Sequence, residues 1–244
     1  MLNQNLVILI CLLILFFVLL TLGKFVMFLS SHTSLSNSHS LRNHDPPWIS
    51  LIQNVGLLSI FMLQHTFQAK KAIKKLLHHL NCDVSERLLY NIGSCIVLQV
   101  VMYFWQPVQS CTLWQIPTSN HPLAWWFFTL VHTISWLIIY SGCYIMDLTE
   151  LLGIKQVYHH FQHWPKPLCQ KSEGLQRIYR HMRHPGFSTL PVIMFVHPVM
   201  QLDRLLLAFI LTIYMILQFK VDDIDYAYQK RMLQRKVRDL STVN

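Results

Sequence analysis

The Lys and Arg residues of this chain are spread unevenly between its apolar stretches, and this alternation constrains the fold more than any other feature. Seventeen of the twenty lie in three intervals, Gln68–Arg87, Asp147–Pro185 and the tail after Phe219. The other three are Lys24, Arg42 and Arg204. The interval Gln106–Pro122 contains none. Because short loops rich in Lys and Arg stay on the cytoplasmic side during membrane insertion, the pattern predicts both termini on the cytosolic or nucleoplasmic side.

The apolar stretches themselves predict about six membrane-spanning helices in a single membrane-embedded domain over residues 1–244. Each is close to the length of about 20 residues that crosses a bilayer as an α-helix. The expected spans cover residues 6–29, 48–67, 88–105, 123–146, 186–200 and 205–219. The expected fold class is therefore an all-α, polytopic membrane helix bundle. The first stretch is expected to stay as an anchor, because MLNQN lacks the basic residues of a signal peptide.

Composition agrees with a membrane protein and argues against other classes. Only 13% of the residues are charged, whereas a soluble domain carries about 25%. The net charge of +9 is explained by loops that flank spans, so direct binding to nucleic acid is not expected. The expected partner is the lipid bilayer, and the basic loops and tail suit anionic lipid.

The cysteine and histidine spacings do not predict a metal site. No two of the six cysteines lie within four residues of each other. Five histidines fall close together in the sequence but match no zinc pattern: His159, His160, His163, His181 and His184. The sequence therefore predicts no metal centre.

The fifth apolar stretch is short and contains Pro191 and Pro198. Proline frees a backbone carbonyl that neighbouring groups must satisfy inside a membrane. Two interpretations remain open, a kinked span and a re-entrant hairpin with the sixth stretch. Both leave the tail on the same side.

Two segments outside the spans have helical periodicity. Apolar residues in Asp147–Phe161 recur at helical spacing, which predicts a helix along the interface. The tail 226–240 places Tyr226, Leu233 and Val237 on one side of a basic helix. It predicts an amphipathic helix on a membrane surface, and a docking tail for protein or chromatin is the alternative.

The segment Arg177–Pro185, which reads RIYRHMRHP, is the strongest candidate site. Arginines beside the start of a broken span suit an anionic group, although an ordinary basic flank of a span has the same composition. Three carboxylates, at Asp222, Asp223 and Asp225, follow the sixth stretch. They are either an acid–base group or solvated ends. We expect Arg183, His184 and Asp222 to converge at the cytoplasmic mouth of a pocket between the fifth and sixth spans and the tail.

His65 and His132 lie within the second and fourth apolar stretches. Polar residues at membrane depth are candidate functional residues, and helix–helix hydrogen bonds are the structural alternative.

Several longer motifs of the chain resemble the nurim family of inner nuclear membrane proteins. They are ERLLY at Glu86–Tyr90, SWLIIY at Ser135–Tyr140, ELLGIKQVYHH at Glu150–His160 and DRLLLAFILTIY at Asp203–Tyr214. The resemblance implies a multi-pass protein held in the inner nuclear membrane, with no established catalytic activity and no cofactor. It also implies nuclear-envelope proteins as partners of the basic loops and tail.

A more distant resemblance links this family to the isoprenylcysteine carboxyl methyltransferases. It rests on Arg183, His184 and Pro185, with Asp222 near the position of an acidic cluster. It implies a scaffold of that methyltransferase type. The implied alternative function is methyl transfer from S-adenosylmethionine to a lipophilic or thiol substrate, with these four residues binding the cofactor. Phe187 and Thr189 replace the tyrosine and glycine of those enzymes, and Lys220 replaces an arginine. No catalytic residue is assigned.

Overall fold

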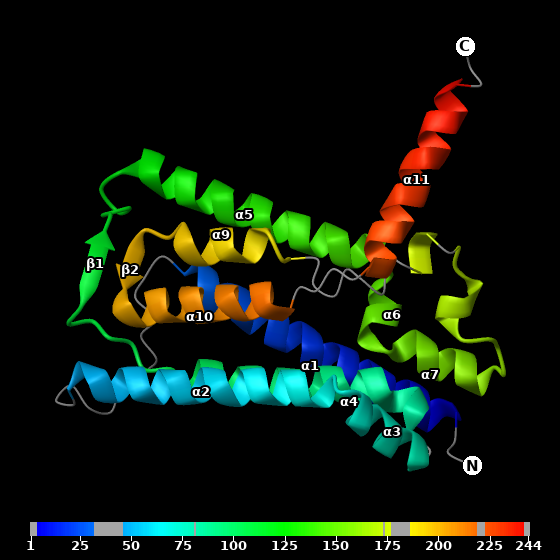
Figure 1. Cartoon of the computed structure of the whole chain (residues 1–244). Helices are drawn as coiled ribbons and strands as arrows, with labels where there is room; N and C mark the ends of the chain where they lie inside the picture. Colours follow the sequence, from blue (N-terminus) through cyan, green and yellow to red (C-terminus); the bar gives the residue numbers. More distant parts are fainter. Residues whose placement is uncertain are drawn as a thin grey trace.

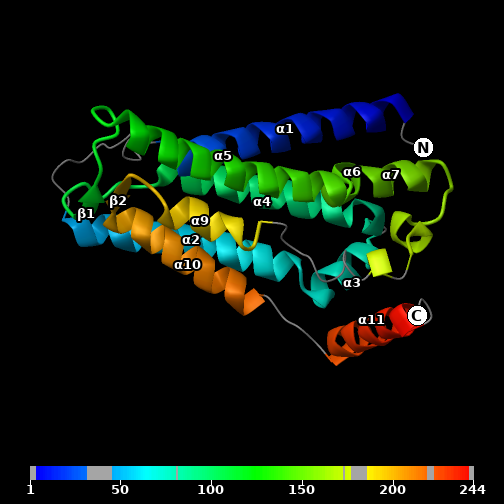
Figure 2. The same cartoon turned by 90° about the horizontal axis from the view of Figure 1, so that it is seen from above.

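The computed structural model describes residues 4–31, 46–80, 82–172, 174–176, 186–218 and 223–241. These residues form a polytopic bundle of α-helices, as the alternation of apolar and basic segments predicted. Four helices are long and apolar enough to cross a membrane: α1 (Gln4–Ser30), α2 (Pro47–Gln68), α4 (Glu86–Phe104) and α5 (Pro122–Ile145). Helix α4 packs against both α1 and α2 (Figures 1 and 2), whereas α5 lies on the other side of the bundle in Figure 1.

The fifth and sixth apolar stretches form a shorter hairpin. Helix α9 (Thr189–Phe195) has 7 residues and α10 (Leu202–Gln218) has 17. At 1.5 Å per residue, α9 is only about 10 Å long, about a third of the thickness of the hydrocarbon layer. It packs between α5 and α10, which cover its backbone. The hairpin turns through strand β2 (Val199–Gln201), which pairs antiparallel with β1 (Thr112–Gln115).

The two ends of the bundle differ in composition (Figure 1). The sheet lies at one end, here called the β end, together with the C-terminus of α1 and the N-termini of α2 and α5. The opposite, basic end carries the start of α1, the short helices and the tail helix. The elements of the basic end are α3 (Lys71–His79), η1 (Asp83–Ser85), α6 (Leu148–Leu152), α7 (Ile154–Phe161), η2 (Pro167–Gln170) and α11 (Asp223–Ser241). Both chain ends therefore lie at the basic end, as both views show.

The predicted interfacial helix of Asp147–Phe161 is divided in two. Gly153 has φ +90, in the left-handed region, and ends α6. A Cβ at this position would lie 2.7 Å from the backbone nitrogen of Leu88. The helix breaks here because α4 begins against it, and only glycine fits the turn.

The core lies between α1, α2, α4, α5, α9 and α10. Trp105, Leu58, Ile193 and Leu207 are among its buried residues, each no more than 1% exposed. The outer faces of the long helices expose many large apolar side chains, as expected where lipid replaces water. The predicted tail helix is α11, which leaves the basic end and runs across the direction of the bundle helices (Figure 1).

Candidate functional site

The four residues of the predicted cofactor site, Arg183, His184, Pro185 and Asp222, lie outside the described residues. The neighbouring carboxylate Asp223 is exposed at the start of α11. The location of the predicted site is therefore judged from the described residues on either side of the two gaps.

The segment before the first gap lies close to α11, which follows the second gap. A Cβ on Gly174, which precedes the first gap, would lie 2.8 Å from the Tyr228 hydroxyl of α11. A Cβ on Gly186, which follows that gap, would lie 3.1 Å from Ile139 of α5. Residues 219–222 connect α10 to α11. The chain before Arg183 thus meets the chain after Asp222.

A polar cluster lies between α2, α4 and α10, and we call it the His65 cluster: His65, Thr66, Tyr90, Ser94 and Tyr214. The Tyr90 hydroxyl lies 2.6 Å from His65 Nε2, and the Ser94 hydroxyl lies 3.2 Å from His65 Nδ1. Thr66 and Tyr214 share a hydrogen bond of 2.9 Å between their hydroxyl groups. A neutral imidazole can accept from one hydroxyl and donate to the other, so these contacts satisfy His65 and join two helices.

The His65 cluster supports the structural interpretation of His65, a helix–helix hydrogen bond. The cluster also contains four hydroxyl groups that sequence reasoning missed, those of Thr66, Tyr90, Ser94 and Tyr214. Tyr90 and Ser94 are four residues apart and share one face of α4. This spacing of two hydroxyl groups, together with a histidine in the neighbouring apolar stretch, is the sequence pattern from which the cluster could have been predicted.

His132 has a comparable role at the β end, where it holds the C-terminus of α1. Its Nδ1 lies 2.9 Å from the Ser30 hydroxyl, and its Nε2 lies 2.7 Å from the Val196 carbonyl oxygen. The Trp136 indole also donates to the Ser30 hydroxyl at 2.8 Å. These contacts connect α1, α5 and the end of α9, so they satisfy polar groups at a helix end that water does not reach.

His197 completes the same end of the bundle. Its Nε2 lies 2.9 Å from the Ser31 carbonyl oxygen, and its Nδ1 accepts from the Val199 backbone N–H at 3.2 Å. The carbonyl oxygen of His197 accepts from the Trp114 indole at 2.9 Å. The hairpin between α9 and α10 is thereby tied to α1 and to β1.

Asp203, which is fully buried, anchors the loop after α4. Its two carboxylate oxygens accept from the Trp105 indole at 2.9 Å and from the Val108 backbone N–H at 3.1 Å. The neighbouring Arg204 is 3% exposed and donates to the Leu29 carbonyl oxygen of α1. Charged residues this deeply buried persist because hydrogen bonds compensate their desolvation.

A network of charges holds the loop after α5 at the basic end. Asp147 has φ 60 and caps α6, accepting from the Glu150 backbone N–H at 3.2 Å. It also accepts from Thr149 at 2.6 Å and from Lys155 at 2.5 Å. Partial burial acts to raise the pKa of Asp147, but the bonds from Lys155, Thr149 and Glu150 outweigh it and lower the pKa to about 2. Asp147 is therefore a carboxylate at physiological pH.

Glu150 is buried beneath this loop, with its side chain 3% exposed. The Lys171 ammonium lies 3.1 Å from Glu150 Oε2, in an ion pair without good hydrogen-bond geometry. The carbonyl oxygen of Glu150 accepts from Arg87 at 3.3 Å, and Asn91 donates to the Leu151 carbonyl oxygen at 3.0 Å. The loop is fixed to the start of α4 on one side and to η2 on the other.

The described polar groups thus form structural networks at the two ends of the bundle and one cluster between helices. Within the described ranges, no three His, Cys, Asp or Glu side chains group closely enough to hold a metal ion. The arrangement can fix helices, hold charges in pairs and present a basic surface. The remaining place where a binding or reactive site could form is the junction between Gly174 and α11, next to both gaps.

Comparison with known proteins gives relatives of similar length. The chain is 38% identical over 237 residues to the protein named Nurim homolog of Drosophila melanogaster, covering 91% of each chain. It is 37% identical over 230 residues to Nurim of Xenopus laevis, covering 88% of this chain and 80% of the relative. It is 37% identical over 195 residues to Nurim of Homo sapiens, covering 78% and 73%. No protein-family model and no solved structure matches the chain.

Proposed function

Because the chain belongs to the nurim family, we propose that it is a multi-pass protein retained in the inner nuclear membrane, with both termini in the nucleoplasm and no catalytic activity. The observation that carries the proposal is the placement of the basic intervals. Their described residues lie together at the end of the bundle that also holds both chain ends. Under the positive-inside rule, this is the end that faces the cytosol before a protein reaches the nuclear envelope.

The orientation is tested with short epitope tags at the two ends of the full chain. Digitonin opens the plasma membrane and leaves the nuclear envelope closed, whereas stronger detergent opens both. We expect both tags to be hidden from antibody after digitonin and revealed together after the stronger detergent. A C-terminal tag that behaves differently from the N-terminal tag would rule out the proposed topology.

Helix α11 supports contact with anionic lipid. Of its described side chains only Tyr228 is half-buried, and the others are exposed. Leu233 and Val237 lie on one face and are 67% and 62% exposed, while Arg231 and Arg235 lie on the opposite face. A basic helix that runs across a bundle at its basic end has the geometry of an interfacial helix. Each basic residue near an anionic surface contributes about 1 kcal/mol.

This contact is tested by limited trypsin digestion of the full chain in nanodiscs. Discs of phosphatidylcholine alone are compared with discs that also contain phosphatidylserine. We expect phosphatidylserine to slow cleavage at Arg235, and a variant with Arg231→Gln and Arg238→Gln to lose most of this protection. Equal cleavage in both kinds of disc would exclude an anionic-lipid contact.

The second candidate is a membrane methyltransferase that uses S-adenosylmethionine. The contact between Gly174 and Tyr228 favours it, because the segments leading to Arg183 and from Asp222 meet there. An arginine and a histidine opposite a carboxylate would suit the carboxylate and ammonium of the methionine moiety. The cofactor would supply an electrophilic methyl group to a thiol or lipophilic acceptor.

Calorimetric titration of the detergent-purified chain with S-adenosylmethionine separates the two candidates. Heat of binding that is lost in both His184→Ala and Asp222→Asn would favour the enzyme. A flat titration with a folded, monodisperse protein would favour the non-catalytic proposal. Tyr228→Phe serves as the control, because it changes the junction without removing a residue of the predicted site.

A further inference from the structure

Lys24 is a positively charged residue on the outward face of α1, the most apolar of the four long helices. It makes no hydrogen bond or ion pair within the part of the chain that the structure describes. The proposed orientation places it in the half of the membrane nearer the β end, where positive charge is disfavoured. An exposed ammonium in this position needs a partner that the bundle does not supply.

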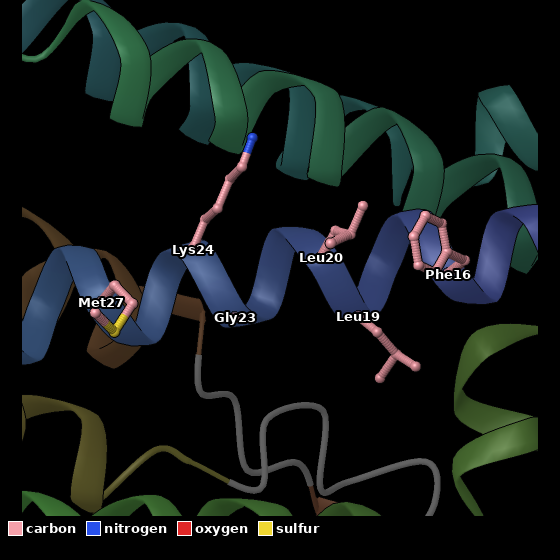
Figure 3. Close-up of a pocket in the computed structure, with 6 residues that line it drawn as sticks. All are labelled: Phe16, Leu19, Leu20, Gly23, Lys24 and Met27. Atoms are coloured by element: carbon pink, nitrogen blue, oxygen red, sulfur yellow. The ribbon is translucent and has the colours of Figure 1, made fainter.

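Lys24 lies on an open, mostly apolar face of α1 (Figure 3). The residues around it on this face all belong to α1 itself: Phe16, Leu19, Leu20, Gly23 and Met27. No atom lies within 4 Å of a Cβ built on Gly23. A glycine on an open helix face allows a second helix to approach closely, because no side chain keeps the two backbones apart.

Helix α1 cannot rotate to hide this face. The neighbouring side of α1 packs against α4, where Gln99 donates to the Thr21 hydroxyl at 2.7 Å and Val18 is 4% exposed. The C-terminus of α1 is held at Ser30 and at the Leu29 carbonyl oxygen. Lys24 is therefore fixed on the outside of the bundle.

The direction of the side chain keeps the ammonium away from the nearer membrane surface. Lys24 lies six residues before Ser30, about 9 Å along the helix. Cα–Cβ bonds tilt toward the N-terminus of a helix, and in Figure 3 the Lys24 side chain extends mainly sideways from α1, with a slight tilt toward the Leu20 side. The ammonium is therefore not turned toward the end of α1 at Ser30, where a lipid headgroup would lie.

We propose that this face of α1 docks a transmembrane helix of another protein that carries an Asp or Glu at the depth of Lys24. A carboxylate would pair with the ammonium, and the open face at Gly23 would allow the partner's backbone to approach closely. The depth of Lys24 rests on the proposed membrane protein function, but the docking face does not depend on the nuclear location.

A second copy of this chain does not fit. Among the described residues of α1, α2, α4, α5 and α10, the only carboxylates are Glu86 and Asp203. Asp203 is fully buried, and Glu86 pairs with Lys74 at the basic end at 2.7 Å. Two copies meeting through this face would place one Lys24 against the other. The described carboxylates therefore favour a different protein as the occupant.

The test is photo-crosslinking in membranes of cells that express the full chain. The substitution Met27→p-benzoylphenylalanine puts the probe on the docking face, one turn from Lys24, and Met27 is 69% exposed. Leu137→p-benzoylphenylalanine, on the exposed face of α5, is the matched control, since Leu137 is 59% exposed. Adducts are identified by mass spectrometry.

We expect the Met27 probe, but not the Leu137 probe, to give an adduct with an integral membrane protein that has Asp or Glu within a transmembrane helix. Lys24→Leu should reduce the adduct at least tenfold at unchanged protein level. Lys24→Glu should abolish it, and replacing the partner's carboxylate by Lys should then restore it.

Four outcomes would overturn the proposal. They are an adduct only with phospholipid, no adduct, the same adduct from the Leu137 probe, and an adduct that Lys24→Leu leaves unchanged. Asp45→Asn is a further control, because Asp45, which lies outside the described residues, follows α1 in the chain. If it reduces the adduct as much as Lys24→Leu does, the partner of Lys24 is the chain's own carboxylate and the proposal fails.

Discussion

Lys171 and Glu150 form an ion pair of 3.1 Å in which the carboxylate side chain is 3% exposed and the lysine side chain 13%. The pair joins the segment after η2 to α6 across the basic end. A second pair, Lys74 with Glu86, is shorter at 2.7 Å, but its side chains are 49% and 33% exposed. Comparing the two pairs therefore separates the effect of burial on stability from the effect of the distance between the charged atoms.

Lys171→Met should destabilise the protein by about 3 kcal/mol, because it leaves the Glu150 carboxylate buried without its counterion. In a chain of this size, that corresponds to a fall of roughly 6–12 °C in melting temperature. Lys74→Met, the matched exposed variant, should cost at most about 1 kcal/mol. Thermal unfolding of both variants in detergent, followed by size-exclusion chromatography, measures the difference. Equal losses would mean that burial does not control these pairs.

Gly153→Ala should destabilise the protein by more than about 1 kcal/mol, since φ is +90 and the added Cβ meets the Leu88 nitrogen at 2.7 Å. Gly56→Ala is the control, because no atom lies within 4 Å of a Cβ there and α2 is helical. Its melting temperature should stay the same or rise slightly. A Gly153→Ala variant that melts like the wild type would show that α6 and α4 can separate at little cost.

The stability of the basic end should depend on pH through Asp147. The pKa of Asp147 is lowered from 3.8 to about 2 in the folded protein. Its contribution is therefore complete above about pH 4 and is lost as the pH falls through 2. Melting temperatures measured between pH 5 and 2 should fall more steeply for the wild type than for Asp147→Asn, which keeps a capping oxygen but has no charge. Asp223→Asn, at an exposed site, should follow the wild-type profile.

Asp203→Asn should cost about 2–3 kcal/mol, because its amide group turns a donor toward either the Trp105 indole or the Val108 N–H. One of these buried donors then loses its acceptor. The measurement is the melting temperature in detergent, with Trp105→Phe as a second probe of the same bond. If the double variant loses no more stability than either single variant, the carboxylate and the indole stabilise the protein through the same hydrogen bond. Losses that simply add in the double variant would contradict this.

Charge alternation and apolar length were sufficient to predict the class of fold, the grouping of basic segments at one end and the tail helix. They did not predict how short the helix of the fifth apolar stretch, α9, would be. Pro191 and Pro198 indicated a broken segment, but its length depends on packing between α5 and α10, which sequence periodicity does not record. The division of α6 from α7 likewise depends on the approach of Leu88, a residue more than sixty positions away in the chain.

The candidate site was less accessible from sequence. His65 and His132 were identified as polar residues in apolar stretches, but their partners were not, because hydroxyl groups such as Ser30 and Ser94 have little influence on hydropathy. Asp203 and Arg204 are adjacent charged residues at the start of an apolar stretch. A hydropathy pattern assigns such residues to a loop, although both are buried in the structure. Arg183 and Asp222 remain a prediction.

The two ends of the bundle respond to different conditions. The β end is held by buried indole, imidazole and carboxylate hydrogen bonds, which salt scarcely reaches, whereas the basic end also depends on the half-buried Lys155–Asp147 pair, which salt and acid weaken. A rise in ionic strength or acidity should therefore loosen the molecule from one side of the membrane only. The β end would keep its structure while the loops of the basic end become more mobile.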